Sequence, residues 1–152
     1  MRSRLAVLVV FVTSLIGALA AIATADAGRP LSATPLTGAA EIPGPGDPDA
    51  SGTADVRLNQ GQGTVCFSVS WTNVDGTVFA GHIHRGSADV AGPILVTLFS
   101  GSFAGTDATS GCVEDVDTAL IKEIRQDPTA FYVNVHSSPA FGGGAVRGQL
   151  SR

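Results

Sequence analysis

The strongest constraint on the fold is a pair of segments in which apolar and polar residues alternate with a period of two. They are Ser51–Asn59 and Thr64–Thr72, and a turn over residues 59–63 joins them. A period of two is typical of a strand with one buried face, and a short glycine-containing turn between two such strands indicates an antiparallel hairpin. The apolar face of the second strand consists of Val65, Phe67, Val69 and Trp71.

Other short segments with strand-like patterns follow, separated by glycine and proline. We predict strands over residues 36–41, 78–84, 93–100, 130–136 and 144–151, and a weak polar strand or bend over 101–112. One helix is predicted over residues 117–125, with Asp115 or Asp117 capping its first turn and Pro128 ending it. Seven or eight short strands and one short helix predict an all-β fold, and we expect an antiparallel Greek-key β-sandwich.

The N-terminus has the features of a secretory signal peptide. Arg2 and Arg4 precede an apolar run that continues to about Ile22, and two overlapping small-residue cleavage patterns follow at residues 23–27. An uncleaved membrane anchor is the alternative, because the apolar run is borderline in length for crossing a bilayer. The cleavage patterns favour removal of the segment, and therefore a secreted protein, extracellular or at the cell surface, without a membrane span.

Cleavage is expected near Asp26 or Gly28, and the sequence does not decide between these two sites. On this interpretation residues 1–27 are the signal peptide, residues 28–35 are a short leader, and residues 36–152 form one β-sandwich domain. About 125 residues are enough to bury a genuine core.

Charge and cysteine content narrow the function further. The chain has 9 Lys and Arg residues against 13 Asp and Glu residues, with no basic cluster, and this does not suit a nucleic-acid partner. Its two cysteines, Cys66 and Cys112, are predicted to form a disulfide, because an even pair in an exported chain is normally oxidised. Two buried free thiols are the alternative.

The three histidines of the chain all fall in strand-like segments. His82 and His84 are one residue apart in AGHIHRG, and His136 lies in FYVNVHSSP. In a strand, residues i and i+2 point to the same face, so the first two imidazoles can reach one ion. Their face is opposite that of Phe79 and Ile83, which are expected to face the core. If the two strands are neighbours, the three imidazoles meet on one outer surface, where they suit copper or zinc.

Four further residues are candidates for roles around such a site. Asn134, Tyr132 or Asp89 could add a ligand or a hydrogen bond to a ligand. Arg147 could guide an anion to the histidine face, or it could hold the C-terminal strand through a salt bridge or a carbonyl contact. The alternative for the histidines themselves is structural, with ring nitrogens bonded to one another and to backbone carbonyls of residues 137–144.

The ordered pieces LTGAAEIP, SGTADVRLN, GTVCFSVSW, GHIHRG, GPILVTLFS and FYVNVHSSPAFGGGAVRGQL resemble the chordin-type domain called CHRD. The resemblance extends from about Leu36 to Leu150. It departs from the family pattern at Ala145 and Val146, where an acidic residue and an isoleucine normally stand before Arg-Gly. The resemblance implies a β-sandwich module of extracellular proteins, without an agreed biochemical activity. We expect the sandwich to be immunoglobulin-like or superoxide-dismutase-like.

A weaker local resemblance is to copper-zinc superoxide dismutase, a Greek-key sandwich with an HxH pair on one strand and a histidine on a later one. His82, His84 and His136 occur in that order here, and Arg147 follows near the C-terminus. The bridging histidine and the histidine-rich zinc loop of that family have no counterpart. The resemblance therefore implies a mononuclear copper or zinc site at most, and it counts against a complete dismutase.

Two hypotheses follow. The first is an extracellular module that binds another protein or a surface component and has no catalytic residues, since no nucleophile motif, zinc-protease motif or paired-carboxylate motif is present. The second is a small extracellular metalloprotein in which His82, His84 and His136 hold copper or zinc. Titration of the mature protein with Cu(II) distinguishes them, because only the metal hypothesis predicts near-stoichiometric uptake that is lost in a His84→Ala variant. That hypothesis also requires the three imidazoles to converge in the folded chain.

Overall fold

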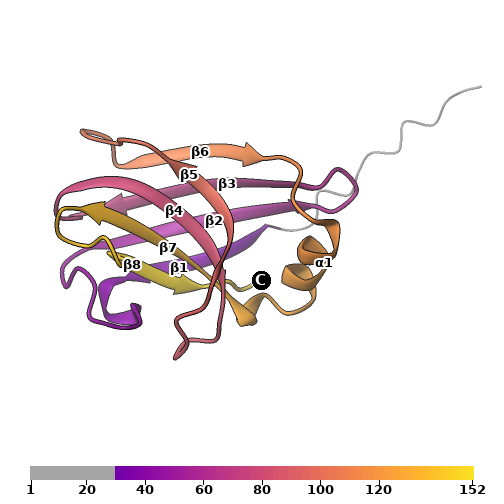
Figure 1. The fold of residues 1–152 in the computed structure, drawn as a ribbon, viewed down its shortest axis with the longest axis horizontal. Helices are drawn as coiled ribbons and strands as arrows, with labels where there is room; N and C mark the ends of the chain where they lie inside the picture. The colour runs from indigo at the N-terminus through magenta and orange to yellow at the C-terminus, as the bar shows by residue number, and fades with distance from the viewer. Residues whose placement is uncertain (1–29) are drawn as a thin grey trace, which may run out of the picture.

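The computed structural model describes residues 30–152, and the predicted signal peptide, residues 1–27, lies outside them. The described part contains eight strands, one α-helix and two 3-10 helices (Figure 1). The strands are β1 (Leu31–Thr37), β2 (Ser51–Asn59), β3 (Thr64–Thr72), β4 (Thr77–Arg85), β5 (Ile94–Ser100), β6 (Ala108–Val113), β7 (Phe131–Ser138) and β8 (Val146–Gln149). The helices are α1 (Thr118–Gln126), η1 (Gly38–Ala40) and η2 (Pro128–Ala130).

All eight strands belong to one antiparallel sheet, in the order β5-β4-β7-β8-β1-β2-β3-β6. The sheet curls until its two edges, β5 and β6, lie beside each other, so it is nearly closed around the core (Figure 1). The predicted all-β fold with one short helix is confirmed. The two layers of the expected sandwich are parts of one continuous sheet.

The β2–β3 hairpin forms over the predicted residues, Ser51–Asn59 and Thr64–Thr72. In β3 the side chains of Val65, Phe67, Val69 and Trp71 are buried, as their alternation predicts. Helix α1 begins after Asp117, whose side chain accepts a hydrogen bond from the amide of Ala119 at 2.8 Å. This cap satisfies one of the free amides of the first helical turn.

The strands differ from the prediction in several places. Strand β6 begins only at Ala108, although a weak strand or bend was predicted from residue 101, and β8 covers only Val146–Gln149 of the predicted 144–151. Two further differences concern β1 and β4. The first strand begins at Leu31 rather than at residue 36, and it ends at Thr37, where η1 replaces the predicted end of the strand. Part of the expected leader therefore pairs with β2. The period of two did not reveal this strand because Pro35 and an irregular register between Ala33 and Leu36 interrupt the alternation.

The second difference is a bulge in β4. Val78 pairs with Ser137 and Ala80 pairs with His136, so Phe79 is an extra residue on this strand. A bulge reverses the alternation of faces. Val78 is consequently in the core, and Phe79, which was predicted to face the core, lies on the other side, with its ring centroid 6.0 Å from that of His136.

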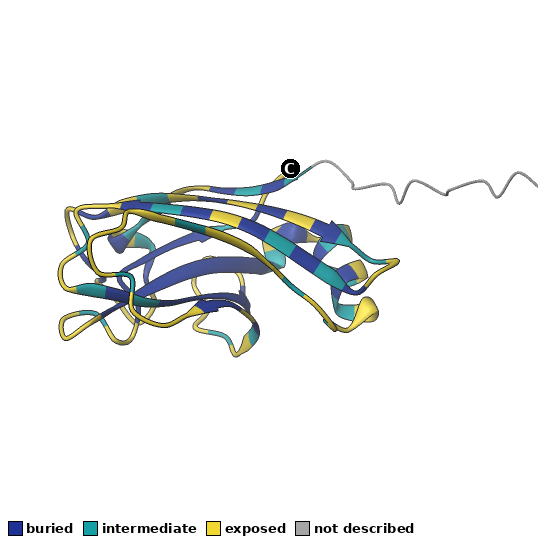
Figure 2. Ribbon diagram, turned by 90° about the horizontal axis from the view of Figure 1, so that it is seen from above, coloured by how far each residue is buried: buried dark blue, intermediate teal, exposed yellow. Residues whose placement is uncertain are grey.

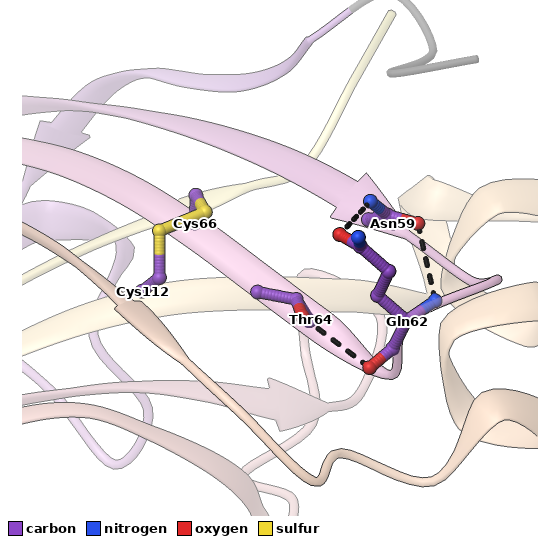
Figure 3. The surroundings of a disulfide bond; sticks show 5 residues. All are labelled: Asn59, Gln62, Thr64, Cys66 and Cys112. Atoms are coloured by element: carbon purple, nitrogen blue, oxygen red, sulfur yellow. Dashed lines mark hydrogen bonds between the residues drawn. A yellow bond between two sulfur atoms is a disulfide. The ribbon is translucent and has the colours of Figure 1, made fainter. Parts of the chain in front are cut away.

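The disulfide between Cys66 and Cys112 is present, and the predicted pairing is confirmed. It joins β3 to the edge strand β6 at directly opposite positions (Figure 3). In the turn that joins β2 to β3, the side chain of Asn59 accepts a hydrogen bond from the backbone amide of Gln62 at 3.2 Å, which helps to fix the hairpin (Figure 3). The described residues contain no helix that is long and apolar enough to cross a membrane.

The strands differ in how many of their faces are buried. In β2, buried residues alternate with exposed or partly exposed ones, whereas β7 is buried on both faces over nearly its whole length. Figure 2 shows this contrast between strands with alternating colours and strands that are dark blue throughout. The inner face of β7 contributes Phe131, Val133 and Val135 to the core. Its outer face carries Tyr132, Asn134 and His136, so a second, polar buried layer lies outside the sheet.

Candidate metal site

The three histidines converge because β4 and β7 are neighbours in the sheet. Register places His82 opposite Asn134 and His84 opposite Tyr132, while His136 lies diagonally from His82. One nitrogen from each imidazole lies within 4.8 Å of those of the other two. The sequence indicated that these three residues would meet only if the two strands were neighbours, and they are.

The histidine face is not the open outer surface that the sequence suggested. His82, His84 and His136 are only 9%, 7% and 8% exposed. Two loops reach over them, since Gly92 and Gly142 both place carbonyl oxygens against imidazoles. The burial of this face could not be read from the alternation of β4 and β7, because the loops that directly follow these two strands supply the cover, and alternation does not show where a loop lies.

The hydrogen bonds of two histidines determine their tautomers. Nδ1 of His84 lies 2.8 Å from the carbonyl oxygen of Gly92, and Nδ1 of His136 lies 3.1 Å from that of Gly142. Because a carbonyl oxygen only accepts, both Nδ1 atoms carry the hydrogen, and in the neutral rings both Nε2 atoms present a lone pair. This is the usual arrangement of a histidine that ligates a metal through Nε2.

The lone pairs point into a site that lacks enough hydrogen-bond donors. Nε2 of His84 is buried and has no hydrogen-bond partner. Nε2 of His136 lies 3.0 Å from Nδ1 of His82, which can donate to it, and 3.1 Å from Oδ1 of Asn134, which can only accept. As the Asn134 amide is placed, two acceptors therefore face each other; a cation between them, or a turn of the amide that presents Nδ2 as donor, removes the conflict.

All three imidazoles are held neutral by their surroundings. Burial, together with the smaller effects of the neighbouring His136 and His84, lowers the pKa of His82 to about 4. Burial is also the main cause of the lowered pKa values of His84 and His136. Metal ligands must be deprotonated, so these imidazoles are in the state that a metal requires at neutral pH.

Tyr132 and Arg147 stack one behind the other next to His84. The ring of Tyr132 stacks on that of His84, with centroids 4.7 Å apart and planes inclined by 11°. The guanidinium of Arg147 lies over the Tyr132 ring, 3.4 Å from its centroid. Since His84 belongs to β4 and Arg147 to β8, on opposite sides of β7, Tyr132 separates the two.

Gly92 belongs to the surroundings of the histidines, and sequence reasoning missed it. Its carbonyl oxygen accepts from His84, and its amide donates to the hydroxyl of Tyr132 at 3.1 Å. A Cβ at this position would lie 1.4 Å from the carbonyl oxygen of Arg85, so only glycine fits so close to β4. The glycine next to a proline in the loop before β5 was the only signal in the sequence.

The candidate residues thus fall into two groups, one at the histidines and one at a separate pocket. The three histidines and Asn134 are brought together, and Tyr132 contacts His84. Asp89 lies elsewhere, in a pocket that Arg147 also lines.

Comparison with known proteins gives one family match. The family model described as the CHRD domain matches residues 32–150. Neither the comparison with curated proteins nor the comparison with solved structures gives a match.

Proposed function

The chain belongs to the CHRD domain family, and from this premise we propose that it is an exported module that binds one copper or zinc ion through His82, His84 and His136. The observation that carries the proposal is the convergence of three imidazole nitrogens within 4.8 Å of one another. They come from two strands, and they lie in a buried polar layer that is separate from the hydrophobic core.

The donor set fits a borderline transition metal. Neutral imidazoles are good ligands for copper and zinc, whereas calcium and magnesium prefer oxygen. At a metal–nitrogen distance of about 2.0–2.1 Å, two ligands of a tetrahedral ion are roughly 3.3 Å apart. The pair His82–His136, at 3.0 Å, already has nearly this spacing. The widest pair must close by up to roughly 1.5 Å, which small rotations of the rings can supply.

Each histidine has a definite ligand atom on this proposal. His84 and His136 bind through Nε2, because their Nδ1 atoms donate to Gly92 and Gly142. His82 binds through Nδ1 once its hydrogen has moved to Nε2. The side chain of Asn134 lies next to the ligand atom of His136, with its Oδ1 3.1 Å from Nε2.

The test is a calorimetric titration of the mature protein with Cu(II) and with Zn(II), in the presence of glycine as a competing chelator. We expect one ion per chain with a dissociation constant in the micromolar range or tighter. Loss of one of three ligands in His84→Ala should weaken binding about 100-fold or more, which corresponds to about 2.7 kcal/mol. Gln62→Ala, an exposed change in the β2–β3 turn, is the matched control and should bind as the parent does.

Binding that is no tighter than that of the His84→Ala variant would refute the metal proposal. The imidazole cluster would then be a hydrogen-bonded polar layer, and the chain would be a CHRD module that acts through its surface.

Export is the second part of the proposal. It is supported by the N-terminal basic and apolar pattern and by the Cys66–Cys112 disulfide, a bond that persists in oxidising compartments. N-terminal sequencing of protein recovered from the culture medium should give a start near Asp26 or Gly28. Recovery of the full-length chain from membranes would contradict it.

A further inference from the structure

The disulfide lies on the solvent side of the sheet, at its edge. Cys66 is directly opposite Cys112 on β6 and directly opposite Arg57 on β2, so the three side chains form a row across the outer face. Cys112 is exposed and Cys66 is partly exposed. No residue of β6 is fully buried, and no strand is hydrogen-bonded to the far side of β6. A molecule in solution can therefore reach the sulfur of Cys112 while the core stays intact.

The bond also lies in a surface hollow with a volume of about 360 Å³. Figure 3 shows the two sulfur atoms joining neighbouring segments of the sheet. Asp55, Ser68 and Ser110 form the next row of side chains on the same face, and they line the same hollow. A hollow of this size has room for a small thiol next to the bond. Exposed disulfides are the ones that exchange readily with thiols.

The charges around the bond differ between its two ends. The exposed Arg57 stands one strand away from Cys66 and two strands away from Cys112, and neighbouring strands are about 4.8 Å apart. Within residues 30–152 no acidic side chain forms an ion pair with Arg57. Asp55 opposes it from the next row, opposite Ser68. Since a nearby cation stabilises a thiolate, Cys66 is the better leaving group of the two sulfurs.

Access favours the same direction of reaction. A thiolate attacks a disulfide along the sulfur–sulfur axis, from the side opposite the leaving sulfur. The approach to Cys66 runs over β2, where the side chain of Arg57 stands. The approach to Cys112 runs over the exposed edge strand β6. Both access and leaving-group stability therefore point to attack at Cys112.

We propose that the Cys66–Cys112 disulfide is a site of exchange with small-molecule thiols, in which the thiolate attacks Sγ of Cys112 and Cys66 leaves beside Arg57. The Cys66–Cys112 bond breaks, and a bond forms between Cys112 and the sulfur of the thiol. The electron pair of the broken bond stays on Cys66, which takes up the proton that the thiol released. A second thiol then attacks the sulfur of the first, which gives the oxidised small molecule and the protein dithiol. Two electrons pass from two thiols to the protein.

The test is a short reaction of the metal-free mature protein with mercaptoethanol, stopped by an excess of N-ethylmaleimide. Within the described chain both cysteines are in the bond, so no other thiol of residues 30–152 reacts. Peptide mapping by mass spectrometry should find mercaptoethanol mainly on Cys112 and maleimide mainly on Cys66. The rate constant should be unchanged by about 1 M urea, although urea at that concentration raises the unfolded fraction about fivefold or more.

Three variants test the roles of the charges. Arg57→Gln should slow the exchange roughly threefold, the effect of one charge at this spacing in a solvated setting. Asp55→Asn should accelerate it by a similar factor. Lys122→Gln removes an exposed positive charge on α1, away from the hollow, and should react as the parent does. The difference between parent and Arg57→Gln should shrink in about 1 M sodium chloride, which screens exposed charges.

Three results would overturn the proposal: adducts mainly on Cys66 or shared equally, an unchanged rate in Arg57→Gln, or a rate that rises with urea as the unfolded fraction does. The last result would mean that only the unfolded chain reacts. Each of them leaves the metal proposal untouched, because β3 and β6 carry none of the three histidines.

Discussion

Glu41 shows how the environment of one residue can change its chemistry. It is 3% exposed, and its Oε1 has no hydrogen-bond partner. The backbone of Gly144 approaches the carboxylate so closely that a Cβ there would lie 2.5 Å from it. Gly144 has a φ of 145°, which also favours glycine. Burial is the main cause of the raised pKa of Glu41, and the positive charge of Arg147 only partly opposes it.

The stability of the protein should therefore depend on the protonation of Glu41. Its pKa rises from 4.5 to about 7 on folding, so the folded state holds this proton more tightly than the unfolded state does. The contribution of Glu41 to the free energy of unfolding consequently falls as pH rises from about 4.5 to about 7, and it stays low above that. Glu41→Gln should therefore be more stable than the parent at about pH 8. The difference in the free energy of unfolding between variant and parent should be larger at pH 8 than at pH 5 by up to about 3 kcal/mol.

Urea denaturation of both proteins at the two pH values measures this difference. Glu114→Gln, at an exposed position, serves as the control and should show no such gain. If the stability of Glu41→Gln changes with pH as the parent's does, the carboxyl group of Glu41 is not the cause of the pH dependence.

At the scale of single elements, regular alternation was predictable and its interruptions were not. The β2–β3 hairpin follows its sequence pattern because nothing disturbs the period of two in Ser51–Asn59 or Thr64–Thr72. In β4, the bulge at Phe79 exchanges the faces of its first residues, and no residue in the sequence marks it. The paired faces of His82 and His84 were nevertheless predicted correctly, because they lie beyond the bulge and keep the i, i+2 spacing.

The edge strand β6 depends on the disulfide more than any other strand does. Most of its residues are exposed, and it pairs only with β3. The bond closes a loop with a sequence separation of 46. Replacing both cysteines, Cys66→Ala with Cys112→Ala, should lower the free energy of unfolding by about 3–4 kcal/mol, because the unfolded chain gains freedom.

Equilibrium urea unfolding of the double variant gives this value. Zinc affinity should stay the same, since β3 and β6 contribute no ligand and β4 and β7 contribute all three. A loss of zinc binding under conditions where the variant is folded would contradict this independence of the two regions.

At the scale of the whole molecule, the candidate site is a product of topology. His82 and His136 are 54 residues apart in the chain and meet because β7 inserts beside β4. The identity of the three ligands could be proposed from the sequence, since they share strand faces of the same kind. Bonds between the histidines and to backbone carbonyls of residues 137–144 were foreseen as the structural alternative, and His136 makes such contacts with His82 and Gly142. The burial of the histidines and the contact from Gly92 could not be predicted. These features depend on where loops lie, and no periodicity encodes that.

A site assembled only in the folded state couples metal binding to global stability. Zinc at a free concentration of 100 times its dissociation constant should stabilise the protein by about 2.7 kcal/mol. For a domain of this size, that corresponds to a rise of the melting temperature by roughly 10 °C. Differential scanning calorimetry with and without zinc measures the shift.

His84→Ala is the control for this experiment, and its melting temperature should be nearly independent of zinc. An equal rise in both proteins would place the bound zinc somewhere other than the histidine cluster.

The chain has a single tryptophan and a single tyrosine, and they report on different layers. Trp71 lies in the apolar core, where its ring stacks near Phe99, while Tyr132 is pressed against the imidazole of His84. Near-ultraviolet circular dichroism and fluorescence can thus follow the two layers separately without any attached dye. The native chromophores make loading of the histidine cluster and melting of the interior two distinct optical signals from one unlabelled sample.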